Sequence, residues 1–305
     1  MGTPEFAAFH LKKIVESHFN VIAVFTQPDR RRGRGKKITP TPVKEMASAF
    51  SIPVYQFDTI NKGEGYDTLI SLKADVIIVV AYGLILKKRV LEIAPLGCFN
   101  VHASLLPKYR GASPINCAIE RGERKTGITI IKMDEHIDTG AIALSKECAI
   151  SLEDTFGTLH DKLKRLGAET LIEFLRMLEM GKVKLRVQDN AKATYAPRIT
   201  KDKLWINWNE NGWEVFNRIR AYDPYPAART HWNNDRSLKL FEARFVRLES
   251  NELPGKVISV SKDGIIVMTG KDGVLIKGVQ PEGSRKMSAL DFCNGYHLSV
   301  GNRFS

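Results

Sequence analysis

An asparagine and a histidine two residues apart could carry acyl-transfer chemistry. Asn100 and His102 stand in an apolar run over residues 97–104. If this run is a strand, alternate side chains project from the same face, and both residues lie near its carboxyl end, where open α/β sheets bind ligands. There an amide could donate to a developing oxyanion and an imidazole could act as acid or base. The alternative is a structural hydrogen-bonded pair at the strand end.

An acidic turn further along could supply the carboxylate that orients such an imidazole. Residues 133–140 read Met-Asp-Glu-His-Ile-Asp-Thr-Gly and follow another apolar run. Asp134, Glu135 and Asp138 are the candidates. Acids in turns are usually solvated turn formers, and the spacing does not choose among these three.

A strongly basic segment precedes both motifs. Residues 30–37 read Arg-Arg-Arg-Gly-Arg-Gly-Lys-Lys, and the whole chain of 305 residues has a formal net charge of +12. The segment is either a solvated loop or a flexible contact to the phosphates of a nucleic acid. It is not a dinucleotide-binding motif, because Gly33 and Gly35 lack the third glycine and the strand-to-helix setting.

These motifs lie within alternating apolar runs and helical patterns. Residues 21–25 and 75–80 are continuous apolar runs, which are typical of buried parallel strands. Further strands are expected over residues 97–104, 126–133 and 141–150, and helices over 42–50, 113–121 and about 154–181. We therefore predict an α/β fold with a Rossmann-like, doubly wound and mostly parallel sheet.

The pattern changes after residue 181. Residues 182–200 carry five basic residues and one acid and have no regular periodicity, which indicates a basic linker. Beyond a short helix near residues 213–221, short strands alternate with turn signals, and this spacing suggests a small OB-like β-barrel. The predicted domains are residues 1–181, a linker over 182–203, and a carboxyl-terminal domain over 204–305.

Composition excludes several classes of protein. A hydrophobic fraction of 43% and a charged fraction of 26% are ordinary for a globular chain. No apolar run approaches the roughly 18 residues of a membrane helix, and no basic-then-apolar leader opens the chain. The four cysteines are too widely spaced for a metal site. We expect a cytoplasmic protein with no bound metal and no membrane association.

The motifs together resemble the folate-dependent formyltransferases. Residues 100–107 read Asn-Val-His-Ala-Ser-Leu-Leu-Pro and residues 138–140 read Asp-Thr-Gly, and both motifs are specific to that family. The resemblance extends over nearly the whole chain, through residues 2–7, 25–37, 79–86, 110–112 and 219–226. The basic segment and the second domain narrow it to the members that formylate methionyl-tRNA.

The resemblance implies transfer of a formyl group from 10-formyltetrahydrofolate to the α-amino group of methionyl initiator tRNA by a monomer. It implies a catalytic trio of Asn100, His102 and Asp138. It also implies that the folate is bound by Tyr82, Gly83, Leu84, Ile85, Leu86, Ser104, Leu105, Leu106 and Pro107. The expected tRNA contacts are Arg30, Arg34, Lys36 and Lys37, together with the linker and the β-barrel.

Two alternatives stay open. One is a folate-dependent formyltransferase that acts on a sugar-nucleotide or purine-pathway amine. The other is an inactive, truncated RNA-binding protein, because members of the family carry a further strand before the step that here reads Gly2-Thr3-Pro4. The resemblance therefore predicts a sheet whose first strand is missing.

Overall fold

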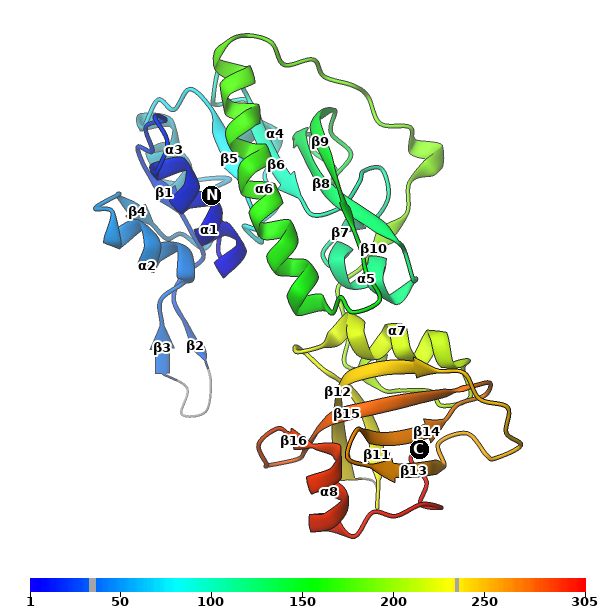
Figure 1. The fold of residues 1–305 in the computed structure, drawn as a ribbon. Coiled ribbons are helices and arrows are strands. Elements are labelled where there is room, and N and C mark those ends of the chain that lie inside the picture. The colour runs from blue at the N-terminus through cyan, green and yellow to red at the C-terminus, as the bar shows by residue number, and fades with distance from the viewer. Residues whose placement is uncertain (33–36, 234–235) are drawn as a thin grey trace. The chain divides into compact units, whose positions relative to one another are not determined.

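The computed structural model describes residues 1–32, 37–233 and 236–305, which form two compact units (Figure 1). Unit 1 comprises residues 1–111, 126–148 and 161–195, and unit 2 comprises residues 112–125, 149–160 and 196–305. Unit 2 therefore combines two internal segments of the chain with the carboxyl-terminal residues. Domain limits at residues 181 and 203 stay a prediction.

Unit 1 contains a four-stranded mixed sheet in the order β5–β6–β8–β9. Its strands are β5 (Ile77–Val79), β6 (Cys98–His102), β8 (Lys125–Lys132) and β9 (Ile142–Ala149). Strands β5 and β6 run parallel, whereas β8 runs antiparallel to β6. The strands expected over residues 97–104, 126–133 and 141–150 are therefore confirmed. The sheet is parallel on only one side of β6.

The helices follow the sequence pattern closely. They are α1 (Glu5–Val15), α2 (Pro42–Ala49), α3 (Glu64–Ser71), α4 (Lys88–Leu91), α5 (Pro114–Glu120) and α6 (Phe156–Glu179). Thr41 caps α2, because its side chain accepts from the Lys44 amide at 3.1 Å, and Pro42 occupies the first turn. Helix α6 buries leucines at helical spacing, including Leu159, Leu163 and Leu171.

Met1 and Gly2 lie between two strands of unit 1. Strand β1 (Val24–Phe25) pairs in parallel with β4 (Val54–Tyr55). The Gly2 amide donates to the Phe25 carbonyl at 3.0 Å, and the Val80 amide donates to the Met1 carbonyl at 2.9 Å. Gly2 and Val80 form a parallel bridge. These two residues therefore occupy the end of a strand position between β1 and β5.

A cavity of about 600 Å³ lies beside Met1 and Gly2, between the segments that contain β1 and β5. It is lined by residues 21–25 and 75–78, by Leu11 and Ile14 of α1, and by Leu175 and Leu178 of α6. Strands had been expected over residues 21–25 and 75–80, but β1 has two residues and β5 has three. In the described part of the chain, no strand pairs with residues 21–23 or Val76, so these residues lack the hydrogen bonds that would define a longer strand.

His10 is a buried ionisable side chain beside this cavity. Its Nδ1 lies 2.7 Å from the Phe6 carbonyl, and within the described residues its Nε2 has no hydrogen-bond partner. Burial lowers the pKa of His10 to about 4. The folded protein therefore favours a neutral imidazole at this position.

We expect stability to fall between about pH 6.5 and pH 4 because of His10. The unfolded imidazole takes up a proton over this range that the folded one excludes, and a shift of this size amounts to about 3 kcal/mol at pH 4. Melting temperatures of His10→Leu measured from pH 7 to pH 4 should decline less steeply than those of the wild type. His136→Gln, at an exposed histidine, serves as the control. Parallel declines for wild type and His10→Leu would contradict the assignment.

The ends of the basic segment form a β-ribbon rather than a loop. Strands β2 (Arg30–Arg32) and β3 (Lys37–Thr39) pair antiparallel and extend away from the rest of unit 1 (Figure 1). At the base of the ribbon, Lys44 Nζ lies 2.6 Å from the Asp29 carboxylate and 2.8 Å from the Gln56 side-chain oxygen. The hydrogen bonds from Lys44 and Gln56 hold the pKa of Asp29 below its usual value. The ribbon thus begins from a fixed base.

Unit 2 contains an antiparallel sheet in the order β11–β12–β15–β14–β13, with β16 beside β15. These strands are β11 (Ala228–Trp232), β12 (Arg236–Val246), β13 (Val257–Ser261), β14 (Gly264–Met268), β15 (Gly273–Pro281) and β16 (Met287–Ser288). Strands β11 and β13 stand at opposite ends of this order, so closure into a barrel stays a prediction.

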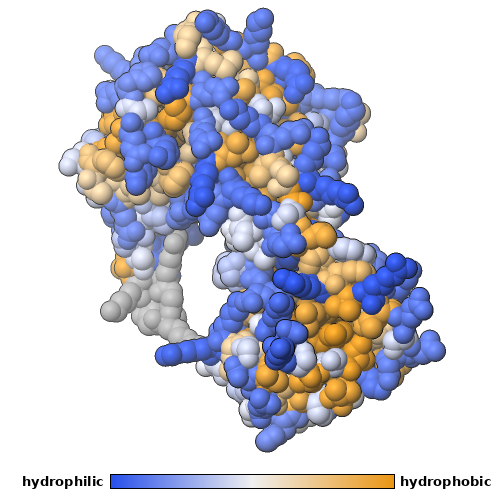
Figure 2. Space-filling model, viewed as in Figure 1, coloured by the Kyte–Doolittle hydropathy of each residue, from blue (hydrophilic) through white to orange (hydrophobic). Residues whose placement is uncertain are grey.

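Two helices of unit 2 complete its core. Helix α7 (Gly212–Tyr222) begins with a capping box between Asn211 and Glu214, and α8 (Ala289–Tyr296) is capped by Ser288. Buried apolar side chains from both helices and the sheet form one cluster. Figure 2 shows hydrophobic side chains gathered on one face of unit 2, with hydrophilic ones along the margins of that face. None of the helices in the described ranges has the length and apolar character needed to cross a membrane.

Candidate active site

Asn100, His102 and Asp138 lie together at the end of β6. Asn100 Nδ2 lies 3.3 Å from Asp138 Oδ1, and His102 Nδ1 lies 3.5 Å from Asp138 Oδ2. Both β6 side chains therefore point to the same face, as strand alternation predicted. The amide of Gly111 also donates to Asp138 Oδ2 at 2.9 Å. The Asp138 carboxylate thus connects an amide, an imidazole and a backbone donor.

The other two acids of the turn, Asp134 and Glu135, have different surroundings. Asp134 accepts hydrogen bonds from the His136 amide at 3.1 Å and from the Thr139 hydroxyl at 2.6 Å, an arrangement that shapes the turn. Glu135 is exposed. The spacing had left Asp134, Glu135 and Asp138 open, and the geometry joins Asp138 to the asparagine and the histidine.

Both ring nitrogens of His102 face acceptors. Nε2 lies 2.9 Å from the Tyr109 carbonyl, opposite the nitrogen that faces Asp138. A protonated imidazole has one hydrogen for each of these acceptors. The His102 side chain is only 6% exposed and that of Asp138 only 13%, so their charges interact with little screening by water. The site therefore orients the imidazole firmly.

Residues 104–107, expected to bind folate, form a tightly bonded turn after β6. The Ser104 hydroxyl donates to the Lys108 carbonyl and the Thr129 hydroxyl donates to the Ser104 carbonyl, both at 2.6 Å. Leu106 packs in a buried cluster with Ile131 and Ile142. Ser104 and Leu106 therefore hold the turn in shape, while Leu105 and Pro107 are half-buried.

Residues 82–86, also expected to bind folate, alternate between core and surface. Tyr82 and Leu86 are buried in the core, Leu84 is half-buried, Gly83 is exposed, and Ile85 is 70% exposed. Asn61 fixes this loop, because it donates to the Ile85 carbonyl and accepts from the Lys87 amide, both at 2.8 Å. The loop presents its middle three residues to solvent.

The expected tRNA-contact residues belong to the β-ribbon segment. Arg30 is exposed at the start of β2, where its guanidinium lies 3.3 Å from the Gln27 side-chain oxygen. Lys37 begins β3. Arg34 and Lys36 lie outside the described residues.

Sequence reasoning missed two residues that contact the Asp138 turn. Gln188, within the stretch assigned as a linker, donates to the carbonyls of Asp138 and Gly140, both at 2.8 Å. Tyr109 supplies the carbonyl that faces His102. Neither residue type at its position carries a sequence signal for such a contact, because both contacts depend on how distant segments pack.

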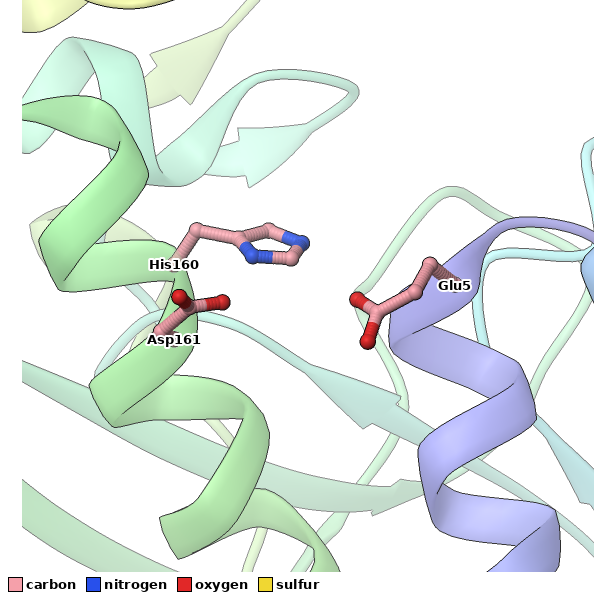
Figure 3. A group of neighbouring side chains, drawn as sticks. All are labelled: Glu5, His160 and Asp161. Atoms are coloured by element: carbon pink, nitrogen blue, oxygen red, sulfur yellow. The ribbon is translucent and has the colours of Figure 1, made fainter.

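Two further places in the described structure hold side chains with candidate nucleophilic or metal-binding chemistry. Cys98 is buried on β6 beside Met133, and burial raises the pKa of its thiol to about 12, which disfavours a thiolate nucleophile. Figure 3 shows Glu5 on α1 and Asp161 on α6, next to His160. Lys164 Nζ lies 2.8 Å from Glu5 and 3.0 Å from Asp161, so the chain itself supplies a cation to both carboxylates.

Comparison with known proteins identifies the family of this chain. Residues 1–175 match the model of the family "Formyl transferase", and residues 198–297 match "Formyl transferase, C-terminal domain". A methionyl-tRNA formyltransferase of Kosmotoga olearia is 50% identical over 302 residues, which is 99% of this chain and 97% of that protein. A second, from Thermotoga maritima, is 44% identical over 304 residues, covering 100% and 96% of the two chains.

Solved structures share the fold at low sequence identity. An N-formyltransferase from Helicobacter canadensis in complex with folinic acid and dTDP-3-aminofucose matches with a TM-score of 0.66 at 19% identity, over 94% of this chain and 97% of that one. HypX from Aquifex aeolicus with tetrahydrofolic acid matches with a TM-score of 0.61 at 18% identity, over 83% and 44%. The fold and the family models define a formyl transferase. The full-length identity is more specific, and the chain belongs to the methionyl-tRNA formyltransferases.

Proposed function

We propose that the protein transfers the formyl group of 10-formyltetrahydrofolate to the α-amino group of methionyl initiator tRNA, using Asn100, His102 and Asp138. The observation that carries this assignment of residues is the contact of Asp138 with both Asn100 and His102. An amide donor, an imidazole and a carboxylate in one place are what amine acylation requires: a donor for the developing oxyanion and a route for the proton.

Asn100 is the donor for the negative charge that develops on the formyl oxygen. One hydrogen of its side-chain amide points to Asp138, and the second is available because an amide nitrogen carries two donors. Asp138 keeps the amide turned in this direction. A donor fixed before the reaction stabilises the transition state without the cost of reorienting.

His102 and Asp138 hold the proton that the attacking amine loses, which the folate nitrogen would take up when its bond to the formyl carbon breaks. His102 Nδ1 faces Asp138 Oδ2, so a hydrogen on Nδ1 is shared with a carboxylate that also fixes the ring. The Tyr109 carbonyl engages Nε2. Direct donation from His102 to the oxyanion would require Nε2 to leave this carbonyl, so we assign the oxyanion contact to Asn100 first.

The surfaces expected to hold the folate fit a flat, partly apolar molecule. The formyl-folate supplies the formyl group on a nitrogen of the cofactor. Ile85 offers an exposed apolar surface beside Gly83, above which there is open space. Tyr82, Leu86, Ser104 and Leu106 set the shape of the two loops from the interior, while Leu84, Leu105 and Pro107 are partly accessible.

A formylation assay tests the choice of substrate. Initiator tRNA charged with methionine is compared with a nucleotide-linked amino sugar, each with 10-formyltetrahydrofolate. Formylation of the aminoacylated tRNA is expected. Formylation of the sugar amine alone would favour the sugar-nucleotide alternative, and no activity on either would favour an inactive RNA-binding protein.

We assign the phosphate contacts of the tRNA to the basic segment, through Arg30, Arg34, Lys36 and Lys37. Replacing Arg34 and Lys36 with alanine should raise the KM for tRNA by about tenfold and lower the slope of log affinity against log salt by about one per lost phosphate contact. The measurement is tRNA affinity between 50 and 200 mM salt, a range of about two doublings. Lys12→Ala with Lys13→Ala removes the same charge from α1 and serves as the control. If both double variants had the same slope, the basic segment would be a solvated segment that makes no contact with the phosphates.

The domain organisation is also part of the proposal. We infer a doubly wound, Rossmann-like catalytic domain over residues 1–181, a basic linker over 182–203, and an OB-like barrel over 204–305 that binds tRNA. The match of residues 198–297 to a separate family model supports an independent second domain. The protein is expected to act as a cytoplasmic monomer without a metal ion.

A further inference from the structure

The buried side chain of Gln188 holds the turn that carries Asp138. Gln188 is 5% exposed, although the sequence around it is basic and polar. Its amide nitrogen donates to the carbonyls of Asp138 and Gly140, both at 2.8 Å. The two carbonyls flank Thr139, so one side chain fixes the backbone before and after the centre of the turn.

Arg110 fixes Gln188 in turn. The Arg110 guanidinium, itself 3% exposed, donates to the Gln188 side-chain oxygen through Nε at 3.2 Å and through Nη2 at 2.7 Å. Nη2 also lies 2.7 Å from the Asn190 side-chain oxygen. A guanidinium can only donate, so it determines which end of the Gln188 amide faces the turn. Both hydrogens of that amide are therefore directed at the two carbonyls.

The Asp138 backbone needs such support. Its φ angle is +55°, in the left-handed region, which costs a residue with a side chain about 1–2 kcal/mol. The conformation turns the Asp138 carbonyl toward Gln188 and the carboxylate toward Asn100 and His102. Arg110 and the adjacent Gly111 thus act on opposite parts of Asp138: Gly111 donates to the carboxylate, and Arg110 acts on the carbonyl through Gln188.

We propose that Gln188, oriented by Arg110, is a positioning residue for formyl transfer that keeps the Asp138 carboxylate aligned with Asn100 and His102. The inference rests on the proposed role of Asp138. Gln188 does not touch the reacting groups in this arrangement. This positioning role makes Gln188, which lies in the stretch predicted to be a linker, part of the catalytic unit.

Gln188→Glu is the most informative variant. An ionised glutamate keeps the size and the contact with Arg110 but has no hydrogen to donate to the two carbonyls. We expect kcat to fall by about 10- to 100-fold, because small displacements of a catalytic group have effects of this size. KM for both substrates should stay within about threefold, because uniform binding is untouched. The pH profile of kcat should change in the same direction as that of Asp138→Asn.

Asn190→Ala is the matched control. It removes a contact of Arg110 but leaves the contacts of Gln188 with the turn, and its kcat and pH profile should stay close to those of the wild type. A melting curve for each variant shows whether it is folded. A folded Gln188→Glu with the wild-type kcat and pH profile overturns the inference.

Asp138→Asn, measured in parallel, separates this inference from the function on which it rests. If Asp138→Asn is slow and Gln188→Glu is not, the positioning role alone fails. If Asp138→Asn has the wild-type kcat, the proposed role of Asp138 and the positioning role of Gln188 fail together. If both variants are slow, the double variant should be little slower than Asp138→Asn, because the two residues act through one carboxylate. Losses that multiply in full would also overturn the inference.

Discussion

Replacing His102 with alanine is expected to lower kcat for formyl transfer by about 10²- to 10⁴-fold, the range that general acid–base groups contribute. The loss has two causes in this structure. The partner that holds a proton beside Asp138 disappears, and Asp138 loses one of the groups that orient it. Affinity for methionyl-tRNA should change by less than about twofold, because His102 is buried and distant in sequence from the basic segment.

The measurement combines single-turnover formylation with a separate tRNA-binding titration. His102 also holds the Tyr109 carbonyl, so His102→Gln is the companion variant: it retains a donor for that carbonyl without an imidazole. Both variants should lose turnover, and His136→Ala, an exposed histidine in the nearby turn, should lose none. Equal losses in turnover and in tRNA affinity would show that His102 supports the fold rather than the reaction.

Local periodicity predicted the parts of the catalytic centre that depend on one segment. Alternation along residues 97–104 places Asn100 and His102 on one face whatever the rest of the fold does, and both side chains meet Asp138. The start of helix α2 at Thr41 and Pro42 also depends only on neighbouring residues. In these cases the chemistry of neighbouring residues was sufficient.

The sequence alone did not predict the contacts between distant segments of the chain. No spacing rule separates Asp138 from Asp134 and Glu135, because the choice depends on which acid the turn directs back to β6. Gln188 lies 50 residues from Asp138 in a stretch without periodicity, and its burial follows only from the folded chain. The basic segment was predicted to be a loop because it is a run of cations. Pairing between Arg31 and Ile38 instead makes its ends a β-ribbon.

The cavity beside Met1 is predicted to accept a β-strand, and a chain extended ahead of Met1 tests this. We expect five added β-branched apolar residues to raise the melting temperature by about 5 °C or more. Each buried apolar side chain contributes about 1.5–3 kcal/mol and each ordered residue costs about 1–2 kcal/mol. The new strand would also gain partners on both sides, since Met1 already pairs with Ile78 and Val80 on the β5 side and Gly2 with Phe25 of β1.

The amino group of Met1 provides the more specific measurement. Burial lowers its pKa from 8.0 to about 6. The unfolded amine takes up a proton between these values and the folded one does not, so stability should decline as the pH falls from 8 to 6. Extension moves the charged amine into solvent and replaces it with a peptide N–H that can still donate to the Ile78 carbonyl, so the decline over this range should become shallower by the contribution of the amine.

An extension of five glycine and serine residues is the control that separates these two effects. It moves the amine but adds no apolar side chains, so it should make the decline between pH 8 and pH 6 shallower to the same extent while raising the melting temperature less than the apolar extension does. Equal melting temperatures for the two extended chains would contradict strand binding in the cavity. An unchanged decline in both would contradict the burial of the Met1 amine.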